Sequence, residues 1–136
     1  MTLFDAKPPK PRTGIRKYVP LPIVILMVLL VGGLVTYRLW NYPEERAVAR
    51  FLNTLERGEY REAYRLWQPS PSYTYEDFLR SWGEQGDYGK IREFELLRAK
   101  SKGSRTVIVT VRINNVSPPL ALLVDRKTKG LAYSIF

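Results

Sequence analysis

The chain has 136 residues and a formal net charge of +9, and it contains neither cysteine nor histidine. These two absences exclude disulfide bonds, thiolate metal sites, lipid attachment through cysteine and any mechanism that needs an imidazole. The basic residues are interspersed with acidic ones instead of forming one stripe, which argues against nucleic acid as a partner. After an apolar N-terminal segment, about 95 residues remain, enough for one small domain.

The first predicted element is a transmembrane helix over residues 18–40. Residues 19–37 read VPLPIVILMVLLVGGLVTY and carry no charge. At about 1.5 Å per residue this run is roughly 28 Å long as a helix, which matches the hydrocarbon core of a bilayer. Aromatic residues that suit the two membrane–water interfaces lie at its ends: Tyr18, Tyr37 and Trp40.

The basic residues before this run predict its orientation. Residues 1–17 form a basic, proline-rich tail that is expected to be disordered and cytoplasmic, because Lys and Arg concentrate on the cytoplasmic side of a span. The domain of residues 41–136 is then extracytoplasmic, and the localisation is a single-pass inner-membrane protein. A cleaved signal peptide would export the same domain, but no Ala-x-Ala-like site follows the run. The topology signal consists of Lys7, Lys10, Arg12, Arg16 and Lys17.

Three short amphipathic helices are predicted next. The first begins at Pro43 and ends at Gly58, with acidic residues in its first turn that complement the helix dipole. The second covers residues 60–67, and the third follows a Thr74-x-x-Asp77 capping box. Each has apolar residues at i, i+3, i+4 and i+7 and needs a partner surface to be stable: Val48, Phe51, Leu52 and Leu55; Tyr60, Ala63, Tyr64 and Trp67; Tyr75, Phe78, Leu79 and Trp82.

The C-terminal half supplies that surface as strands. Residues 105–113 alternate, with valines and Ile113 on one face. Residues 120–124 are continuously apolar, residues 131–135 alternate again, and residues 91–99 are mixed. Helices followed by antiparallel strands predict an α+β fold, in which three short helices pack on a curled antiparallel sheet of about four strands.

The order of these elements resembles the nuclear transport factor 2-like superfamily, a cystatin-like α+β cone. The segment that carries the resemblance is AVARFLNTLERGEYREAYRLW, residues 47–67, in which a glycine joins two helices. A third helix and then strands follow in the family's order over about residues 43–136. The resemblance implies a cone whose interior holds the active site in the family's enzymes, usually as Asp/His or Asp/Tyr groups.

No catalytic, cofactor-binding or metal-binding residue is predicted from these patterns. The Asp/His arrangement is excluded because there is no histidine. An Asp/Tyr pair stays open, although Asp77 is better explained as a cap, Asp125 as a turn residue and Asp87 as a loop residue. A dense aromatic set either fills the core or lines a pocket of the cone: Tyr60, Tyr64, Trp67, Phe78 and Trp82.

Two functions follow from this reading. The first is a membrane-anchored, non-catalytic interaction module of the cell envelope, similar in architecture to the small bitopic subunits of type IV secretion systems. Its expected partners are the lipid bilayer and envelope proteins or a second copy of the chain. The second is a cone that binds a small molecule, or acts weakly on one, in an aromatic-lined pocket. Neither function requires a cofactor.

Overall fold

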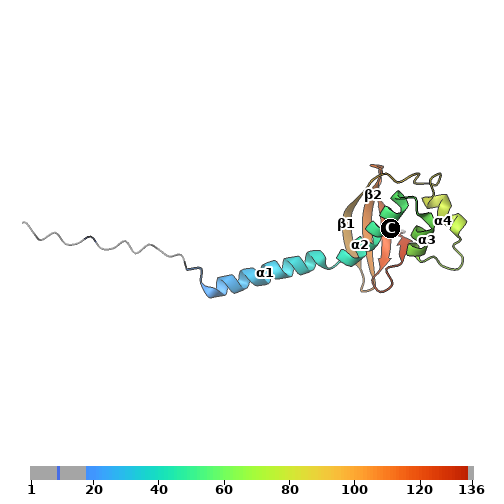
Figure 1. The fold of residues 1–136 in the computed structure, drawn as a ribbon. Helices are drawn as coiled ribbons and strands as arrows, with labels where there is room; N and C mark the ends of the chain where they lie inside the picture. Colours follow the sequence, from blue (N-terminus) through green and yellow to red (C-terminus); the bar gives the residue numbers. More distant parts are fainter. Residues whose placement is uncertain (1–8, 10–17, 135–136) are drawn as a thin grey trace, which may run out of the picture. The chain divides into compact units, whose positions relative to one another are not determined.

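A computed structural model describes residue 9 and residues 18–134. The chain divides into two compact units, residues 1–34 and residues 35–136. Eight elements follow one another along the chain (Figure 1): α1 (Leu21–Leu39), α2 (Tyr42–Glu56), α3 (Tyr60–Trp67), α4 (Tyr75–Trp82), β1 (Phe94–Lys102), β2 (Thr106–Ile113), β3 (Leu120–Asp125) and β4 (Leu131–Tyr133).

The helix α1 is the apolar segment. It has 19 residues, none of them buried, and its only charged side chain is Arg38 in the last turn. Among the described residues, one helical stretch near the N-terminus is long and apolar enough to cross a membrane. The helix predicted over residues 18–40 is therefore present, with its regular part three residues shorter at the start and one residue shorter at the end. The five basic residues of the predicted tail lie outside the described residues, as does the rest of the tail except Pro9.

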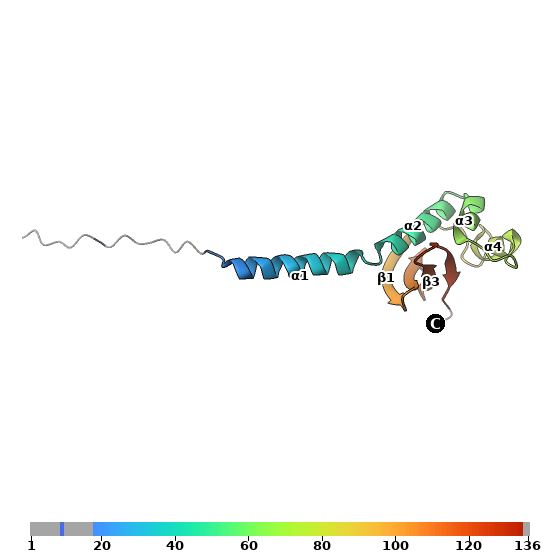
Figure 2. The ribbon, with the colours of Figure 1, turned by 90° about the horizontal axis from the view of Figure 1, so that it is seen from below.

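The second unit is an α+β domain, as predicted. Its four strands form one open antiparallel sheet in the order β1-β2-β3-β4, and the strands curve visibly in Figure 2. In β2 every second residue is buried, so the predicted alternation is confirmed. The mixed segment 91–99 contributes to a regular strand, β1. Its pattern is weak because β1 is an edge strand with an irregularity between Leu96 and Arg98, which interrupts the period of two.

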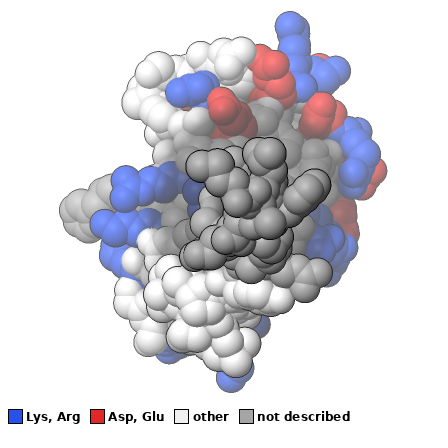
Figure 3. Space-filling model, turned by 90° about the vertical axis from the view of Figure 1, so that its left-hand side faces the viewer, with Lys and Arg blue, Asp and Glu red and all other residues white. Residues whose placement is uncertain are grey.

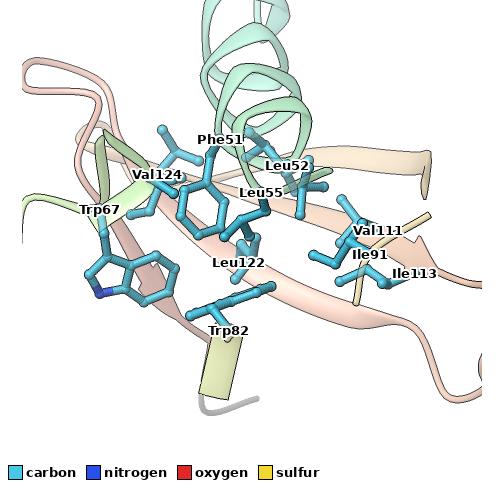
Figure 4. Packing of buried hydrophobic residues seen from close by; sticks show 14 of the residues in the cluster. Phe51, Leu52, Leu55, Trp67, Trp82, Ile91, Val111, Ile113, Leu122 and Val124 are labelled. Carbon is cyan, nitrogen blue, oxygen red and sulfur yellow. The ribbon is translucent and has the colours of Figure 1, made fainter. Parts of the chain in front are cut away.

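The three short helices cover one face of this sheet. The helix α2 contacts β1, β2 and β3, while α3 contacts α2, α4 and β4. In both ribbon views α2 lies across the strands, with α3 and α4 together to one side of it (Figures 1 and 2). Between the layers Phe51, Trp67 and Trp82 face Leu122 and Val124 of β3 (Figure 4). The predicted apolar face of α2 is completely buried, because it packs on the alternating valines of β2.

Local capping and turn chemistry also follow the sequence. The Thr74 hydroxyl accepts from the Asp77 backbone N–H at 3.2 Å, and the Asp77 carboxylate accepts from the Thr74 backbone N–H at 3.1 Å. This is the predicted capping box, and α4 ends before Gly83 as expected. Asp125 accepts from the backbone N–H groups of Lys127 and Thr128 at 2.8 and 2.9 Å, which confirms it as a turn residue.

Asp125 gives the domain a predicted sensitivity to acid. The backbone N–H groups of Thr128 and Lys127, followed by the charge of Arg105, lower the pKa of Asp125 below its ordinary value. A carboxyl group with a lowered folded-state pKa stabilises the fold above its unfolded-state pKa, and this contribution is lost as pH falls through the folded value. In unfolding measured from pH 7 to pH 2, Asp125→Asn should lose less stability across this range than the parent chain. If both chains lost the same stability between pH 7 and pH 2, the Asp125 carboxylate would not be a source of the acid sensitivity.

Candidate functional site

The most unusual charged residue of the domain is Glu44, in the first turn of α2. Its side chain is only 3% exposed. Lys129 donates from Nζ to Glu44 Oε1 at 2.7 Å, and Arg126 Nη1 lies 3.6 Å from Oε2. Both cations belong to the turn between β3 and β4. Because a buried carboxylate is costly unless it is paired, this pairing fixes the start of α2 against that turn.

Arg126 extends the contact to two further segments. From Nη2 it donates to Asn41 Oδ1 and to Ser101 Oγ, both at 2.8 Å, and Ser101 Oγ donates to Asn41 Oδ1 at 3.2 Å. Asn41 lies in the link between α1 and α2, and Ser101 lies near the end of β1. We call Asn41, Glu44, Ser101, Arg126 and Lys129 the polar network. It joins the link, the edge strand and the β3–β4 turn at one place.

A cleft of about 440 Å³ lies beside the polar network, and we call it the link cleft. Its walls come from the last turn of α1, the α1–α2 link and β1, all within the unit of residues 35–136. Three of its side chains are basic and one is acidic. The link cleft is lined by Tyr37, Arg38, Trp40, Asn41, Glu45, Arg98, Ala99, Lys100 and Ser101.

A second cleft, of about 680 Å³, runs between α2, the end of α3 and the β3–β4 turn, and we call it the α2 cleft. Five basic side chains and no acidic one line it: Arg46, Arg50, Arg57, Arg65 and Lys129. Carboxylates just outside the cleft hold three of these cations, in the pairs Arg57–Glu59, Arg65–Glu62 and Lys129–Glu44. Arg46 and Arg50 project from α2 and have no carboxylate within 4 Å among the described residues, so they give the cleft its positive character.

The structure brings the predicted aromatic set together in the core. Phe51 lies 5.3 Å from Trp67, 6.1 Å from Phe78 and 5.0 Å from Trp82 between ring centroids. Phe78 and Trp82 are buried and Trp67 is nearly so, while Tyr60 and Tyr64 are half-buried against the same cluster. None of the five is among the described residues that line the two clefts above or a third at Tyr88–Glu93.

Three polar atoms at the edge of this aromatic cluster are buried without a well-formed hydrogen bond to the described residues: Tyr73 Oη, Trp82 Nε1 and Tyr133 Oη. The Tyr133 ring stacks on Trp82 with centroids 6.0 Å apart and contacts Trp67 at 5.0 Å. Burial raises the pKa of Tyr133 far above its ordinary value, and the nearby hydroxyl of Ser81 only partly opposes this. Tyr133 is therefore a neutral phenol at any physiological pH.

Of the three aspartates weighed for an Asp/Tyr pair, two have structural roles here and Asp87 is an exposed loop residue after α4, as expected. Asp77 caps α4 and Asp125 holds a turn. Within residues 9 and 18–134, no three acidic side chains come together in a way that could hold a metal ion. Two exposed basic residues of α3 and α4 are engaged by neighbours: Arg61 lies 4.4 Å above the Tyr75 ring, and Arg80 pairs with Asp77 at 3.2 Å. Figure 3 shows basic and acidic side chains interspersed along one margin of the face it presents.

The polar network was not predicted. Glu44 and Glu45 were expected to be equivalent, as acidic residues at a helix start. The structure separates them, because Glu44 is buried among cations that lie 82 and 85 residues further along the chain, whereas Glu45 is half-buried at the link cleft. Nothing in the local pattern of residues 43–46 distinguishes the two. In comparisons with protein-family models, curated proteins and solved structures, the chain matches none.

Proposed function

We propose that this chain is a membrane-anchored, non-catalytic interaction module of the cell envelope. The observation that carries the proposal is α1, a 19-residue helix with no buried residue, next to a domain with its own complete core. Nineteen exposed and almost entirely apolar residues are unfavourable in water and favourable in lipid. The helix is the anchor, and the domain of residues 41–136 is what the anchor holds at the membrane.

The proposed orientation places the N-terminus in the cytoplasm and the domain outside it, at the inner membrane. It rests on the five basic residues that precede the uncharged run of residues 19–37. Only Arg38, Arg46 and Arg50 follow the run closely, and Glu44 and Glu45 lie among them. In this arrangement the domain is a cone of the nuclear transport factor 2-like kind that works by docking and not by catalysis. Its rings pack against one another, and the carboxylates of Glu44, Asp77 and Asp125 are used in a buried ion pair, a helix cap and a turn.

The docking face we propose is the α2 cleft. Arg46 and Arg50 are exposed there and one helical turn apart, which suits an acidic surface of a partner protein. A second copy of the chain is the competing occupant. A photoreactive amino acid in place of Arg50, in cells that express the full chain, should crosslink a distinct protein. The same group in place of Gln85, an exposed loop residue, should not. If both positions give the same products, or if mild-detergent purification repeatedly yields neither partner nor homo-oligomer, the proposal fails.

The compartment is tested by a reporter that is active only outside the cytoplasm, fused after Phe136. We expect activity, a full-length product and retention in the membrane pellet at alkaline pH. An inactive reporter would place the domain in the cytoplasm and remove the envelope partners. A shortened, soluble product would mean that the apolar segment is a cleaved signal peptide, in which case the domain is exported but not anchored.

One observation favours the alternative function, a cone that binds a small molecule. The unpartnered polar atoms of Tyr73, Trp82 and Tyr133 lie beside the aromatic set, where a ligand with matching polar groups would satisfy them. If they are only core, the Tyr133 hydroxyl has only the nearby hydroxyls of Ser81 and Tyr73 as weak partners, and Tyr133→Phe should change stability by no more than about 1 kcal/mol. Chemical unfolding of the full chain in detergent measures this. A loss of more than about 1 kcal/mol would instead mean that the hydroxyl makes a strong polar contact in the folded domain.

A further inference from the structure

The link cleft has the composition of an anion site. Arg38, Arg98 and Lys100 are exposed, and among the described residues none of them makes an ion pair with a carboxylate within 4 Å. Glu45 is the one acidic side chain in the lining and is half-buried. The lining therefore carries a net charge of +2. Such a site attracts an anion with several acceptor oxygens, above all a phosphate group.

The base of the link cleft is held in place before any ligand arrives. Asn41 donates from Nδ2 to the Ala99 carbonyl at 3.5 Å and accepts from Ser101 and Arg126. The link between the two helices is thereby fixed to β1, the strand that carries Arg98 and Lys100. These two residues are two positions apart on the strand, so they share one face. The polar network thus fixes the β1 backbone that carries two of the three cations, whose side chains extend from the face of β1 opposite Ala99 and Ser101.

The position of the link cleft along the chain indicates the source of the phosphate. The uncharged run ends at Tyr37, and Arg38 and Trp40 follow within three residues, a rise of about 5 Å along a helix. The polar headgroup layer on each side of the hydrocarbon core is roughly 5–8 Å thick. Tyr37 and Trp40 are 79% and 64% exposed, as expected for rings that settle among headgroups. The lining residues of the link are therefore at headgroup depth whenever the helix spans a bilayer.

From these observations we infer that the link cleft binds the phosphodiester of an anionic phospholipid. Arg38, Arg98 and Lys100 supply the charge, and Tyr37 and Trp40 hold this end of the domain in the interface. The inference rests on the membrane anchor of the proposed function, but not on the docking of a partner to the α2 cleft. It assigns the link cleft a ligand class, and it means that the lipid would hold β1 close to the membrane surface.

The test uses the full chain in mild-detergent micelles and measures lipid retention by native mass spectrometry, with phosphatidylglycerol and phosphatidylcholine supplied at equal concentration. We expect the chain to retain the anionic lipid preferentially. Since each surface cation contributes roughly a fivefold gain in binding to anionic lipid, Arg98→Gln with Lys100→Gln should reduce retention by about 25-fold. The matched control is Lys90→Gln with Arg92→Gln, which removes the same two charges at a different cleft and should change retention by less than about twofold.

Two further experiments test whether lipid retention depends on charge and whether the ligand is a lipid. Arg98→Lys with Lys100→Arg keeps the charges and should keep most of the retention; a loss equal to that of the glutamine pair would show that packing and not charge is involved, and would overturn the inference. Inorganic phosphate at millimolar concentration should not displace the lipid, and full displacement would identify a site for free anions instead. Equal retention of both lipids, or equal losses in the two glutamine pairs, would also overturn it. An inactive reporter fusion would refute the proposed extracytoplasmic placement of the domain. The expected lipid retention would stay the same.

Discussion

Replacing Phe51 by alanine is expected to destabilise the domain by about 3–5 kcal/mol. The Phe51 side chain is fully buried on α2 and its ring contacts Trp67, Phe78 and Trp82, so the substitution opens a cavity where α2, α3 and α4 meet (Figure 4). A domain of this size has a total stability of only about 5–15 kcal/mol, so the loss is a large part of it. Chemical unfolding of the full chain in detergent, followed by tryptophan fluorescence, measures the effect.

The control for this substitution is Val116→Ala. Val116 is also apolar but 63% exposed, in the turn after β2, and its truncation should change stability by no more than about 0.5 kcal/mol. Phe51→Leu keeps most of the volume and should fall between the two. If Phe51→Ala proved as mild as Val116→Ala, the three helices would not share one core, and the packing described above would be wrong.

Lys129→Met is expected to cost about 3 kcal/mol, more than a surface cation normally contributes. The loss comes from Glu44 and not from the lysine, which is 37% exposed. Without Lys129 the carboxylate stays buried, with only Arg126 at 3.6 Å for compensation. Unfolding of the full chain at neutral pH measures the change. Lys127→Met, in the same turn at an exposed position, is the matched control and should be nearly neutral.

The double variant Glu44→Gln with Lys129→Met distinguishes a buried pair from ordinary packing. When both charges are removed no carboxylate is left unpaired, so the double variant should be within about 1 kcal/mol of the parent chain and more stable than Lys129→Met alone. Equal stabilities for the single and double variants would mean that an unpaired Glu44 carboxylate is not the source of the loss. Lipid retention in Lys129→Met adds a second readout: a moderate loss is expected if the polar network positions the link cleft.

Much of the architecture was readable from the sequence, because it depends on short-range periodicity. Nineteen uncharged residues predict α1, and the i, i+3, i+4, i+7 spacing of Val48, Phe51, Leu52 and Leu55 predicts the face of α2 that is buried. The Thr74-x-x-Asp77 box marks the start of α4, and the alternating valines mark β2. The family resemblance, the orientation in the membrane and the function stay predictions.

The candidate sites depended on tertiary structure. Glu44 is buried because the β3–β4 turn brings Arg126 and Lys129 to it from 82 and 85 residues away. The link cleft exists because Asn41 is held against β1, and no local pattern in the sequence indicates that contact. The sequence by itself determined which segments are helices and strands and which faces are apolar, since these follow from the residue period. Only the tertiary structure decided which charges meet, because charge pairing depends on distance in space and leaves no local pattern.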